Sequence, residues 1–332
     1  MLMVVLAEVS KTMLGLQTMP VKLDKQGGIA LVTVLMVFVV AALLASQILF
    51  EHTSSLTLAV AQRERAQIEE YLLAGEALAR QTLKQDFSSD SEFFWDDLSD
   101  NWTRPDTIVF ADGAIDVRVM DIQRGININD LVETEHIEDI APLADWLNVN
   151  NTDSVLLGEL VDWFDEDLFP QGLHGEDQSY LSRELPYRAA NRTMAHVSEL
   201  NWIYSADREL VQALSQVIFT LPPDTAVNVN TADAFRLRRV APLATDQQIS
   251  AIVRARESQP FRDIQEFLED PTVAGLTLHE DKIRVYSEFF RVQVTAKFLN
   301  KQGWLVSLLH RNPQTGEIKT IFRDYSQRFS EV

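Results

Sequence analysis

The sequence contains no cysteine, which excludes disulfides, thiol catalysis and cysteine-based zinc or iron–sulfur sites. Positive charge is scarce as well: 29 Lys and Arg residues stand against 49 Asp and Glu residues, for a formal net charge of −20 at pH 7. Binding to phosphates requires clustered Lys and Arg that release counterions, so we expect no nucleic-acid partner. A chain without disulfides could be stabilised by a metal ion instead, and the many carboxylates favour a hard, oxygen-seeking cation such as Ca²⁺.

The motifs of the common enzyme classes are missing. The chain has no His-Glu-x-x-His, Gly-x-Ser-x-Gly, Gly-x-x-x-x-Gly-Lys or Gly-x-Gly-x-x-Gly, and its six histidines are scattered. Paired carboxylates can perform acid–base chemistry, as in glycosidases, so a hydrolase remains a distant alternative. It would need a deep cleft in which carboxylates face each other. We therefore expect a protein that is not an enzyme.

One long apolar stretch, Ile29–Phe50, carries no charged side chain. As a helix with a rise of about 1.5 Å per residue, it would span the roughly 30 Å hydrocarbon core of a bilayer. Lys22 and Lys25 precede the stretch and Glu51 follows it. Because positive flanks stay on the cytoplasmic side, we expect a single-pass membrane protein with a cytoplasmic N-terminus and a periplasmic bulk.

The flanks of this stretch differ from those of a secretory signal peptide, which has an apolar region of about 7–15 residues followed by a small-residue cleavage site. Here a polar, basic leader ends at Gly28, before the apolar run. This arrangement resembles the class III signal of type IV pilins and type II secretion pseudopilins. The resemblance implies that a prepilin peptidase cuts between Gly28 and Ile29. A start at Met19 would give the leader the short length usual in that family.

Position 33 refines the resemblance. Most family members carry Glu at the fifth mature position, where this chain has Thr33. In a filament that buried carboxylate is thought to pair with the terminal ammonium of a neighbour, because a charge in hydrocarbon is tolerated only when paired. Lack of the Glu is typical of the large minor pseudopilins of the general secretion pathway protein K family. The resemblance therefore implies a subunit at the tip of the filament, with no neighbour above it.

The next segment, residues 51–85, has a helical pattern. Apolar or small residues recur at the spacing of one helix face, and charged residues lie elsewhere: Ile68, Tyr71, Leu72, Gly75, Leu78 and Ala79. We expect this face to pack on a sheet. A coiled coil is the alternative, although no strict heptad persists.

Strand patterns occur on both sides of a long helical region. Residues 107–111 and 114–122 read as a hairpin joined by Asp112-Gly113, and strands return at 284–298, 303–310 and 318–325. Helices are expected near residues 130–147, 153–165, 196–204, 207–217, 232–240, 246–257 and 263–268, with caps at Asn129, Thr152, Thr231 and Thr245. The predicted fold is α+β: a pilin-like N-terminal helix packed on an antiparallel sheet, with a large all-helical domain inserted between strands.

The predicted domain boundaries follow from these patterns. They are a leader over 1–28, a transmembrane and filament-core helix over 29–50, the pilin helix and first strands over 51–125, an inserted helical domain over 126–283, and C-terminal strands over 284–332.

Two short segments, which we call the Asn segments, have similar sequences: Ile126-Asn127-Ile128-Asn129 and Val227-Asn228-Val229-Asn230-Thr231. In each, a short extended piece ends in a residue whose side chain can cap the next helix. Residues 227–268 also resemble the helix-hairpin-helix modules of DNA-uptake proteins. The Gly-Ile-Gly turn that approaches phosphate in those modules is replaced by residues 241–244, which include Pro242 and its missing N–H. We therefore expect this segment to be a packing scaffold.

The most acidic segment runs from Asp162 to Tyr180. Asp165, Asp167 and Glu176 match positions 1, 3 and 12 of an EF-hand, but Phe169 and Pro170 occupy positions 5 and 6, so the segment is not an EF-hand. From these residues alone, a solvated acidic loop is the better interpretation.

The resemblance to the protein K family favours a metal site in this segment. The sequence motifs of that family are matched here by Asp165-Glu-Asp167, Gly175 to Asp177, Tyr180, Asn191 and Ser198-Glu-Leu200. The resemblance implies calcium in the helical domain, and the expected ligands are Asp165, Asp167, Glu176 and Asp177. Asp162 is expected to face away on its helix.

The resemblance covers nearly the whole chain after Lys25. It implies a minor pseudopilin in the inner membrane that initiates or caps the type II secretion pseudopilus for protein export across the outer membrane. The implied partners are the I and J minor pseudopilins, the major pseudopilin filament and the prepilin peptidase. The alternatives are a minor pilin of a type IV pilus and, more distantly, a membrane-tethered periplasmic hydrolase.

Overall fold

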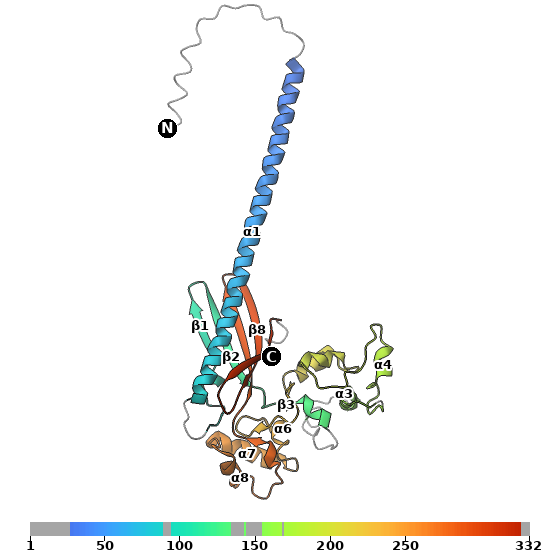
Figure 1. The fold of residues 1–332 in the computed structure, drawn as a ribbon, viewed down its shortest axis with the longest axis vertical. Coiled ribbons are helices and arrows are strands. Elements are labelled where there is room, and N and C mark those ends of the chain that lie inside the picture. Colours follow the sequence, from blue (N-terminus) through green and yellow to red (C-terminus); the bar gives the residue numbers. More distant parts are fainter. Residues whose placement is uncertain (1–26, 89–93, 134–142, 144–154, 168, 327–332) are drawn as a thin grey trace, which may run out of the picture. The chain divides into compact units, whose positions relative to one another are not determined.

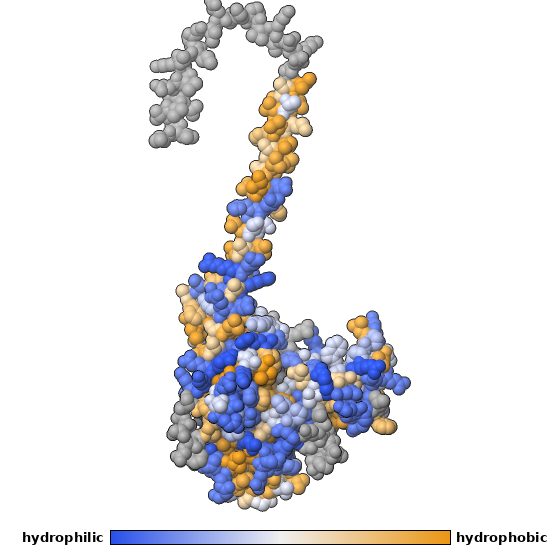
Figure 2. Space-filling view, in the orientation of Figure 1, coloured by the Kyte–Doolittle hydropathy of each residue, from blue (hydrophilic) through white to orange (hydrophobic). Residues whose placement is uncertain are grey.

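The computed structural model describes residues 27–88, 94–133, 143, 155–167 and 169–326. The chain divides into two compact units, residues 1–63 and 64–332. Helix α1 (Gly27–Ser88) begins in the first unit, and within the described residues it is the one helix long and apolar enough to cross a membrane. Its apolar side chains from Ile29 to Phe50 are exposed, as the orange part of the helix in Figure 2 shows. No proline interrupts it.

The second unit contains a five-stranded antiparallel sheet of order β1-β2-β7-β8-β9 (Figure 1). Its strands are β1 (Asp106–Phe110), β2 (Gly113–Asp121), β7 (Phe289–Phe298), β8 (Lys301–Arg311) and β9 (Ile318–Asp324). The predicted combination of an apolar N-terminal helix and an antiparallel sheet is confirmed. The predicted strand 284–298 is two strands, because β6 (Ile283–Arg284) pairs elsewhere.

The β1–β2 turn lies one residue earlier than the sequence predicts. Phe110 pairs with Gly113, so Ala111 and Asp112 form the turn and Gly113 begins β2. A Cβ on Gly113 would lie 2.0 Å from the carbonyl oxygen of Lys297 on β7. The glycine is needed for the close approach of two strands rather than for the turn itself.

The core of this layer lies between α1 and the sheet. Leu72, Ala79 and Leu83 on one face of α1 are buried against alternate residues of β2, β7 and β8, including Val117 and Leu305. At Gly75 an added Cβ would lie 2.5 Å from Val294 Cγ1, so the helix approaches β7 closely there. The predicted apolar face of residues 51–85 thus packs on a sheet and not in a coiled coil.

Residues 122–288 form an insert between the neighbouring strands β2 and β7. Its helices and turns are η3 (Ile128–Glu133), α3 (Val155–Phe164), α4 (Asp177–Leu181), η5 (Val197–Trp202), α5 (Arg208–Leu214), α6 (Ala234–Leu237), α7 (Asp246–Ser258), α8 (Ile264–Leu268) and η6 (Glu280–Lys282). Most of the predicted helix over 130–147 and the cap Thr152 fall outside the described residues. A further short turn, η2 (Asn101–Thr103), precedes β1.

The insert is not purely helical, because it contains two parallel pairs of two-residue strands. β3 (Ile126–Asn127) pairs with β4 (Ile218–Phe219), and β5 (Val227–Asn228) pairs with β6. Each pair closes one lobe with its own apolar core. We call residues 126–222 the first lobe and residues 227–287 the second lobe.

The two Asn segments occupy equivalent places in the two lobes. The amide of Asn129 accepts a hydrogen bond from the Met194 N–H (2.8 Å) and donates to the Met194 carbonyl (3.0 Å). Asn230 makes the same pair of bonds with Phe261, at 2.9 and 2.8 Å. The predicted helix caps at Asn129 and Thr231 are therefore wrong. The Asn129 side chain makes contacts across its lobe instead, the Thr231 hydroxyl donates to Asp121 on β2, and Asp233 caps α6.

The predicted cap at Thr245 is confirmed. Its hydroxyl accepts a hydrogen bond from the Gln248 N–H at the start of α7, and the Gln248 side chain accepts one from the Thr245 N–H. Such a capping box satisfies two backbone donors that a helix start leaves open.

Candidate functional site

The carboxylates of Asp165, Asp167 and Glu176 converge in the first lobe. One oxygen of each lies within 4.8 Å of the other two. Asp165 directly follows α3, and Glu176 directly precedes α4, so the loop between the two helices brings the three together. Three of the four expected metal ligands therefore meet at one place.

The loop is held against α3 by an acid that the sequence analysis placed on the wrong side. Asp162 is fully buried and accepts hydrogen bonds from the N–H groups of Gln171 (2.8 Å) and Gly172 (2.7 Å). It faces the loop, so the expectation that it faces away is wrong. Both of its oxygens are engaged by backbone donors, and it positions the loop. A signal was available, since Asp162 lies one helical turn before Asp165.

Glycines make this close packing possible. A Cβ on Gly175 would lie 1.6 Å from Asp162 Oδ2, and a Cβ on Gly172 would lie 2.4 Å from the Glu159 nitrogen. Glu159, also fully buried, accepts hydrogen bonds from the N–H and hydroxyl of Ser205 at 2.8 and 2.7 Å. The loop can therefore approach α3 only where side chains are absent.

Several oxygens of the three converging carboxylates lack donors, although Asp167 Oδ1 accepts a hydrogen bond from the Phe169 N–H at 2.7 Å. Both oxygens of Glu176 and Oδ1 of Asp165 are buried without a hydrogen-bond partner. Burial, followed by the charges of Asp167 and Asp162, raises the pKa of Asp165 to about 6. Burial and the charges of Asp162 and Asp165 raise the pKa of Glu176 as well. A bound cation would relieve both the repulsion and the missing hydrogen bonds, so the donor set fits an oxygen-seeking metal.

Asp177, the fourth expected ligand, lies outside this group of three. Its oxygens accept from the Ala189 N–H and from Arg188 Nη1, both at 3.0 Å. Asp177 thus joins the start of α4 to the segment after it.

Aromatic contacts connect the loop to the core of the first lobe. His174 stacks on Tyr204 with ring centroids 4.0 Å apart, and Tyr180 on α4 meets Trp163 on α3 edge to face at 5.4 Å. The contact of His174 with Tyr204 could not be predicted from the sequence, because the two residues lie far apart along the chain.

Three arginines of the segment that resembles a DNA-binding module, Arg236, Arg238 and Arg239, are paired with acids of the same chain. Arg236 pairs with Asp130 at 2.6 Å, and it is buried. Arg238 pairs with Asp246, and Arg239 pairs with Asp224. Their charge is neutralised internally, which is consistent with a packing role for residues 227–268.

The residues of the expected cleavage site lie in the first turns of α1. Gly28 and Ile29 directly follow its first residue, Gly27. The Thr33 hydroxyl donates to the Ala30 carbonyl at 2.9 Å, so this polar group is satisfied within the helix.

Comparison with known proteins identifies related chains. Two family models, both described as type II secretion system protein K, match residues 125–223 and 227–285, close to the limits of the two lobes. The type II secretion system protein K of Pseudomonas aeruginosa is 29% identical over 316 residues, covering 91% of this chain and 93% of the relative. That of Pectobacterium carotovorum is 25% identical over 322 residues, covering 91% and 97%.

A solved structure shares the fold. It is the crystal structure of the GspK-GspI-GspJ complex from enterotoxigenic Escherichia coli, in which one chain superposes with a TM-score of 0.64 at 22% identity, covering 80% of this chain and 98% of that one.

An apolar N-terminal helix that continues onto an antiparallel sheet defines a pilin-like subunit. Within that class, the matches over both lobes and over nearly the full length are to one family. The chain belongs to the protein K family and is a minor pseudopilin of the type II secretion system. The relatives are named as secretion-system proteins and not as enzymes.

Proposed function

We propose that this minor pseudopilin occupies the tip of the type II secretion pseudopilus and initiates or caps its assembly for protein export. The observation that carries the proposal is the insert of residues 122–288, which leaves the sheet between two neighbouring strands. A subunit in the middle of a filament has neighbours stacked above it, and a domain of this size would clash with them. Thr33, in place of the usual Glu, is consistent with a subunit that has no such neighbour.

The proposed partners are the I and J minor pseudopilins, with the major pseudopilin filament below them. The solved relative was crystallised with GspI and GspJ, and this chain shares its fold. We propose that residues 29–50 anchor the chain in the inner membrane after the prepilin peptidase removes residues 1–28. The mainly helical domain over residues 126–283 would then lie in the periplasm, between the pilin helix and first strands over 51–125 and the C-terminal strands over 284–332.

Co-expression tests the tip position. The full chain, purified in detergent together with I-type, J-type and major pseudopilins, is expected to form a stable complex with I and J. Deletion of the gene is expected to stop protein export without affecting twitching or adhesion. Cross-links from the insert to major pseudopilin along the filament would overturn the tip position. Loss of twitching instead of export would favour the type IV pilus alternative.

For the metal, we propose that Asp165, Asp167 and Glu176 hold a structural Ca²⁺. The support is the group of buried carboxylate oxygens without donors, described above, and the backbone anchoring of the loop by Asp162. A bound Ca²⁺ would supply positive charge that fixes the loop between α3 and α4. The role of Asp177 in this proposal is to hold the start of α4.

Calcium titration tests this site. In the full chain, after treatment with a chelator, added Ca²⁺ is expected to raise the thermal unfolding midpoint, because a ligand at about 100 times its Kd stabilises by roughly 2.7 kcal/mol. Glu176→Gln is expected to remove most of that rise, and Gly175→Ala to weaken it, since its Cβ would displace Asp162. The exposed Glu184→Gln serves as the matched control. A wild-type midpoint that does not respond to Ca²⁺ would contradict the proposal.

A further inference from the structure

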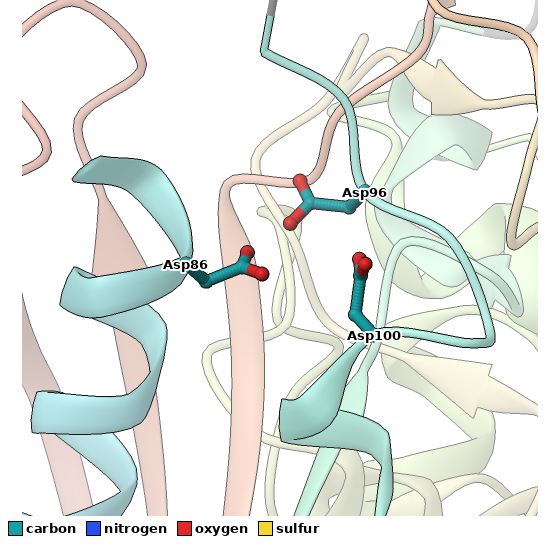
Figure 3. A group of neighbouring side chains, drawn as sticks. All are labelled: Asp86, Asp96 and Asp100. Atoms are coloured by element: carbon teal, nitrogen blue, oxygen red, sulfur yellow. The ribbon is translucent and has the colours of Figure 1, made fainter. Parts of the chain in front are cut away.

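Three aspartates outside the candidate metal site point toward one another where α1 ends (Figure 3). Asp86 lies in the last turn of α1, Asp96 in the segment that follows, and Asp100 just before η2. One oxygen of each lies within 4.8 Å of the other two. Asp96 is completely buried and Asp86 mostly so, at 0% and 17% side-chain exposure. We call these three residues the aspartate cluster.

Arg311, at the end of β8, is fully buried against this cluster. Its Nη2 donates to Asp96 Oδ1 and Oδ2 at 2.6 and 2.5 Å, and its Nη1 donates to Asp86 Oδ2 at 3.3 Å. The rings of Phe94 and Phe290 lie against the guanidinium, with centroids 4.5 and 4.7 Å away. One arginine therefore binds two of the three carboxylates, and its guanidinium and Asp96 are shielded from water.

The other charged groups around the cluster add mainly negative charge. Asp97 is buried beside it, and its N–H donates to Asp100 at 2.8 Å. At the end of β2, buried Asp121 interacts with Asp96 through its charge. Glu288 faces His310 at 3.5 Å, next to Arg311 on β8. Lys84 lies on α1, shortly before Asp86.

The cluster joins the end of α1 to the second lobe. The Asp96 N–H donates to the Val285 carbonyl (2.9 Å), and its carbonyl accepts from Asn228 Nδ2 (3.1 Å). The Ser287 N–H donates to Asp96 Oδ2 (2.6 Å), while Arg311 Nη2 donates to the Ser287 carbonyl (2.9 Å). Whatever holds Asp86, Asp96 and Arg311 together therefore also holds the second lobe to the pilin helix.

We propose that Asp86 and Asp96 share one proton at neutral pH, and that this proton allows Arg311 to tie α1 to the second lobe. Its release in alkaline solution loosens the tie. Carboxylates this close, away from water and with one cation between them, cannot all be ionised, so one retains a proton.

The raised pKa of Asp86 is consistent with this geometry. Burial, followed by the charges of Asp96 and Asp100, raises the pKa of Asp86 to about 8, although Arg311 opposes the rise. Asp100 is affected less: its pKa rises to about 6. Because the native pKa of Asp86 lies above its ordinary value of 3.8, the folded chain holds the proton more tightly than the unfolded chain. Stability therefore falls as the pH rises from about 4 to 8, and stops falling above that.

Urea unfolding of the full chain in detergent, at pH values from 6 to 9.5, tests the proposal. For one proton, the unfolding equilibrium constant rises by up to about tenfold per pH unit below the native pKa. We expect this rise of the unfolding equilibrium constant with pH in the wild type. We do not expect it in Asp86→Asn, because the amide is permanently neutral. Asp112→Asn, at an exposed turn position, is expected to keep the wild-type profile. At pH 7, infrared spectra are expected to show a protonated carboxyl band that Asp86→Asn lacks.

Identical pH profiles for the wild type and Asp86→Asn, or no protonated carboxyl band at pH 7, would overturn the shared proton. If a divalent cation neutralised the cluster instead, the stabilisation by added Ca²⁺ at pH 7.5 would be smaller in Asp86→Asn than in the wild type; equal stabilisation is expected. Should Asp86→Asn fail to fold, Asp100→Asn serves instead. Removing that neighbouring charge is expected to shift the wild-type fall in stability to lower pH, and an unshifted profile would count against the proposal.

Discussion

At the scale of single residues, a second buried carboxylate on α1 behaves opposite to Asp86. Glu76 is 2% exposed and accepts hydrogen bonds from Ser307, Thr320 and Arg323, at distances from 2.6 to 2.9 Å. Burial alone would raise its pKa, but these bonds and one from Arg80 lower it to about 2. Glu76 therefore joins α1 to β8 and β9 as a charged group, whereas Asp86 joins α1 to Arg311 on β8 with a proton.

Replacing Glu76 by Gln is expected to lower the free energy of unfolding at pH 7 by about 2–3 kcal/mol, because charged hydrogen bonds are lost and their donors remain. Since the native pKa lies below the ordinary 4.5, the contribution of Glu76 is complete above pH 4.5 and is lost as the pH falls toward 2. Urea unfolding should therefore show a smaller difference between Glu76→Gln and wild type at pH 3 than at pH 7. The exposed Glu69→Gln is the control, and an equal effect of both substitutions would refute the role of Glu76.

How far the sequence predicts such residues depends on the distance to their partners. Asp165, Asp167 and Glu176 were expected together because they lie in one short acidic segment. Glu76 and Asp86 gave no signal, since their partners Arg323 and Arg311 lie more than 200 residues along the chain. Spacing patterns describe local structure only, and a buried ion pair across the fold leaves no period in the sequence.

At the scale of elements, the two lobes of the insert are built alike. In each, a two-residue strand leads to an Asn that binds both backbone groups of one distant residue, Met194 or Phe261. Each of these residues precedes a short helix. The first turn of that helix contains an acidic residue, Glu199 in η5 and Glu266 in α8. The lobes thus repeat one supersecondary unit, and the two family models end and begin between them.

This equivalence predicts equivalent costs. Asn230→Ala and Asn129→Ala should each lower the free energy of unfolding by about 2–4 kcal/mol, because a buried N–H and a buried carbonyl lose their partner. Asn101→Ala, at an exposed position, should cost less than about 0.5 kcal/mol. Thermal unfolding of the full chain measures all three. If Asn129→Ala were as mild as Asn101→Ala while Asn230→Ala was severe, the two lobes would not be equivalent in stability.

The elements differ in how well the sequence predicts them. Strands β1, β2, β8 and β9 lie close to the predicted ranges because alternation over five or more residues is a clear pattern. The pairs β3–β4 and β5–β6 were missed, since two residues show no period. The Asn segments were noticed, but their last residues were interpreted as helix caps, because the partners of the Asn side chains lie 31 and 65 residues away.

At the scale of the whole molecule, the chain combines an apolar N-terminal helix with the two-layer fold of residues 64–332. Within the described residues, α1 is the one candidate membrane span, and Gly28 lies at its start. The class III leader, which stays a prediction, could be proposed from the sequence because its glycine, apolar run and missing downstream cleavage site are all local features. The assembly partners were predictable only through the family resemblance, since a filament contact leaves no pattern in one chain.

Co-expression with a prepilin peptidase is expected to give a membrane-bound product whose N-terminus, determined by mass spectrometry, is Ile29. Gly28→Val should leave the leader in place, because in the family that the leader resembles the peptidase cuts after a glycine. Gly27→Ala, one residue earlier, should be processed and serves as the control. An intact wild-type leader, or a cut after Phe50, would exclude the pseudopilin pathway and favour the tethered hydrolase.

The insertion of residues 122–288 between adjacent strands also has a mechanical consequence. Asp121, the last residue of β2, pairs with Phe290 at the start of β7, so the insert is attached at two neighbouring points. A force that pulls on the insert as a body reaches β2 and β7 together and in the same direction. It is passed from β7 to β8 as shear along their whole paired length, with many hydrogen bonds loaded at once. A load on the insert is thus resisted by the sheet in shear, and the sheet does not open strand by strand.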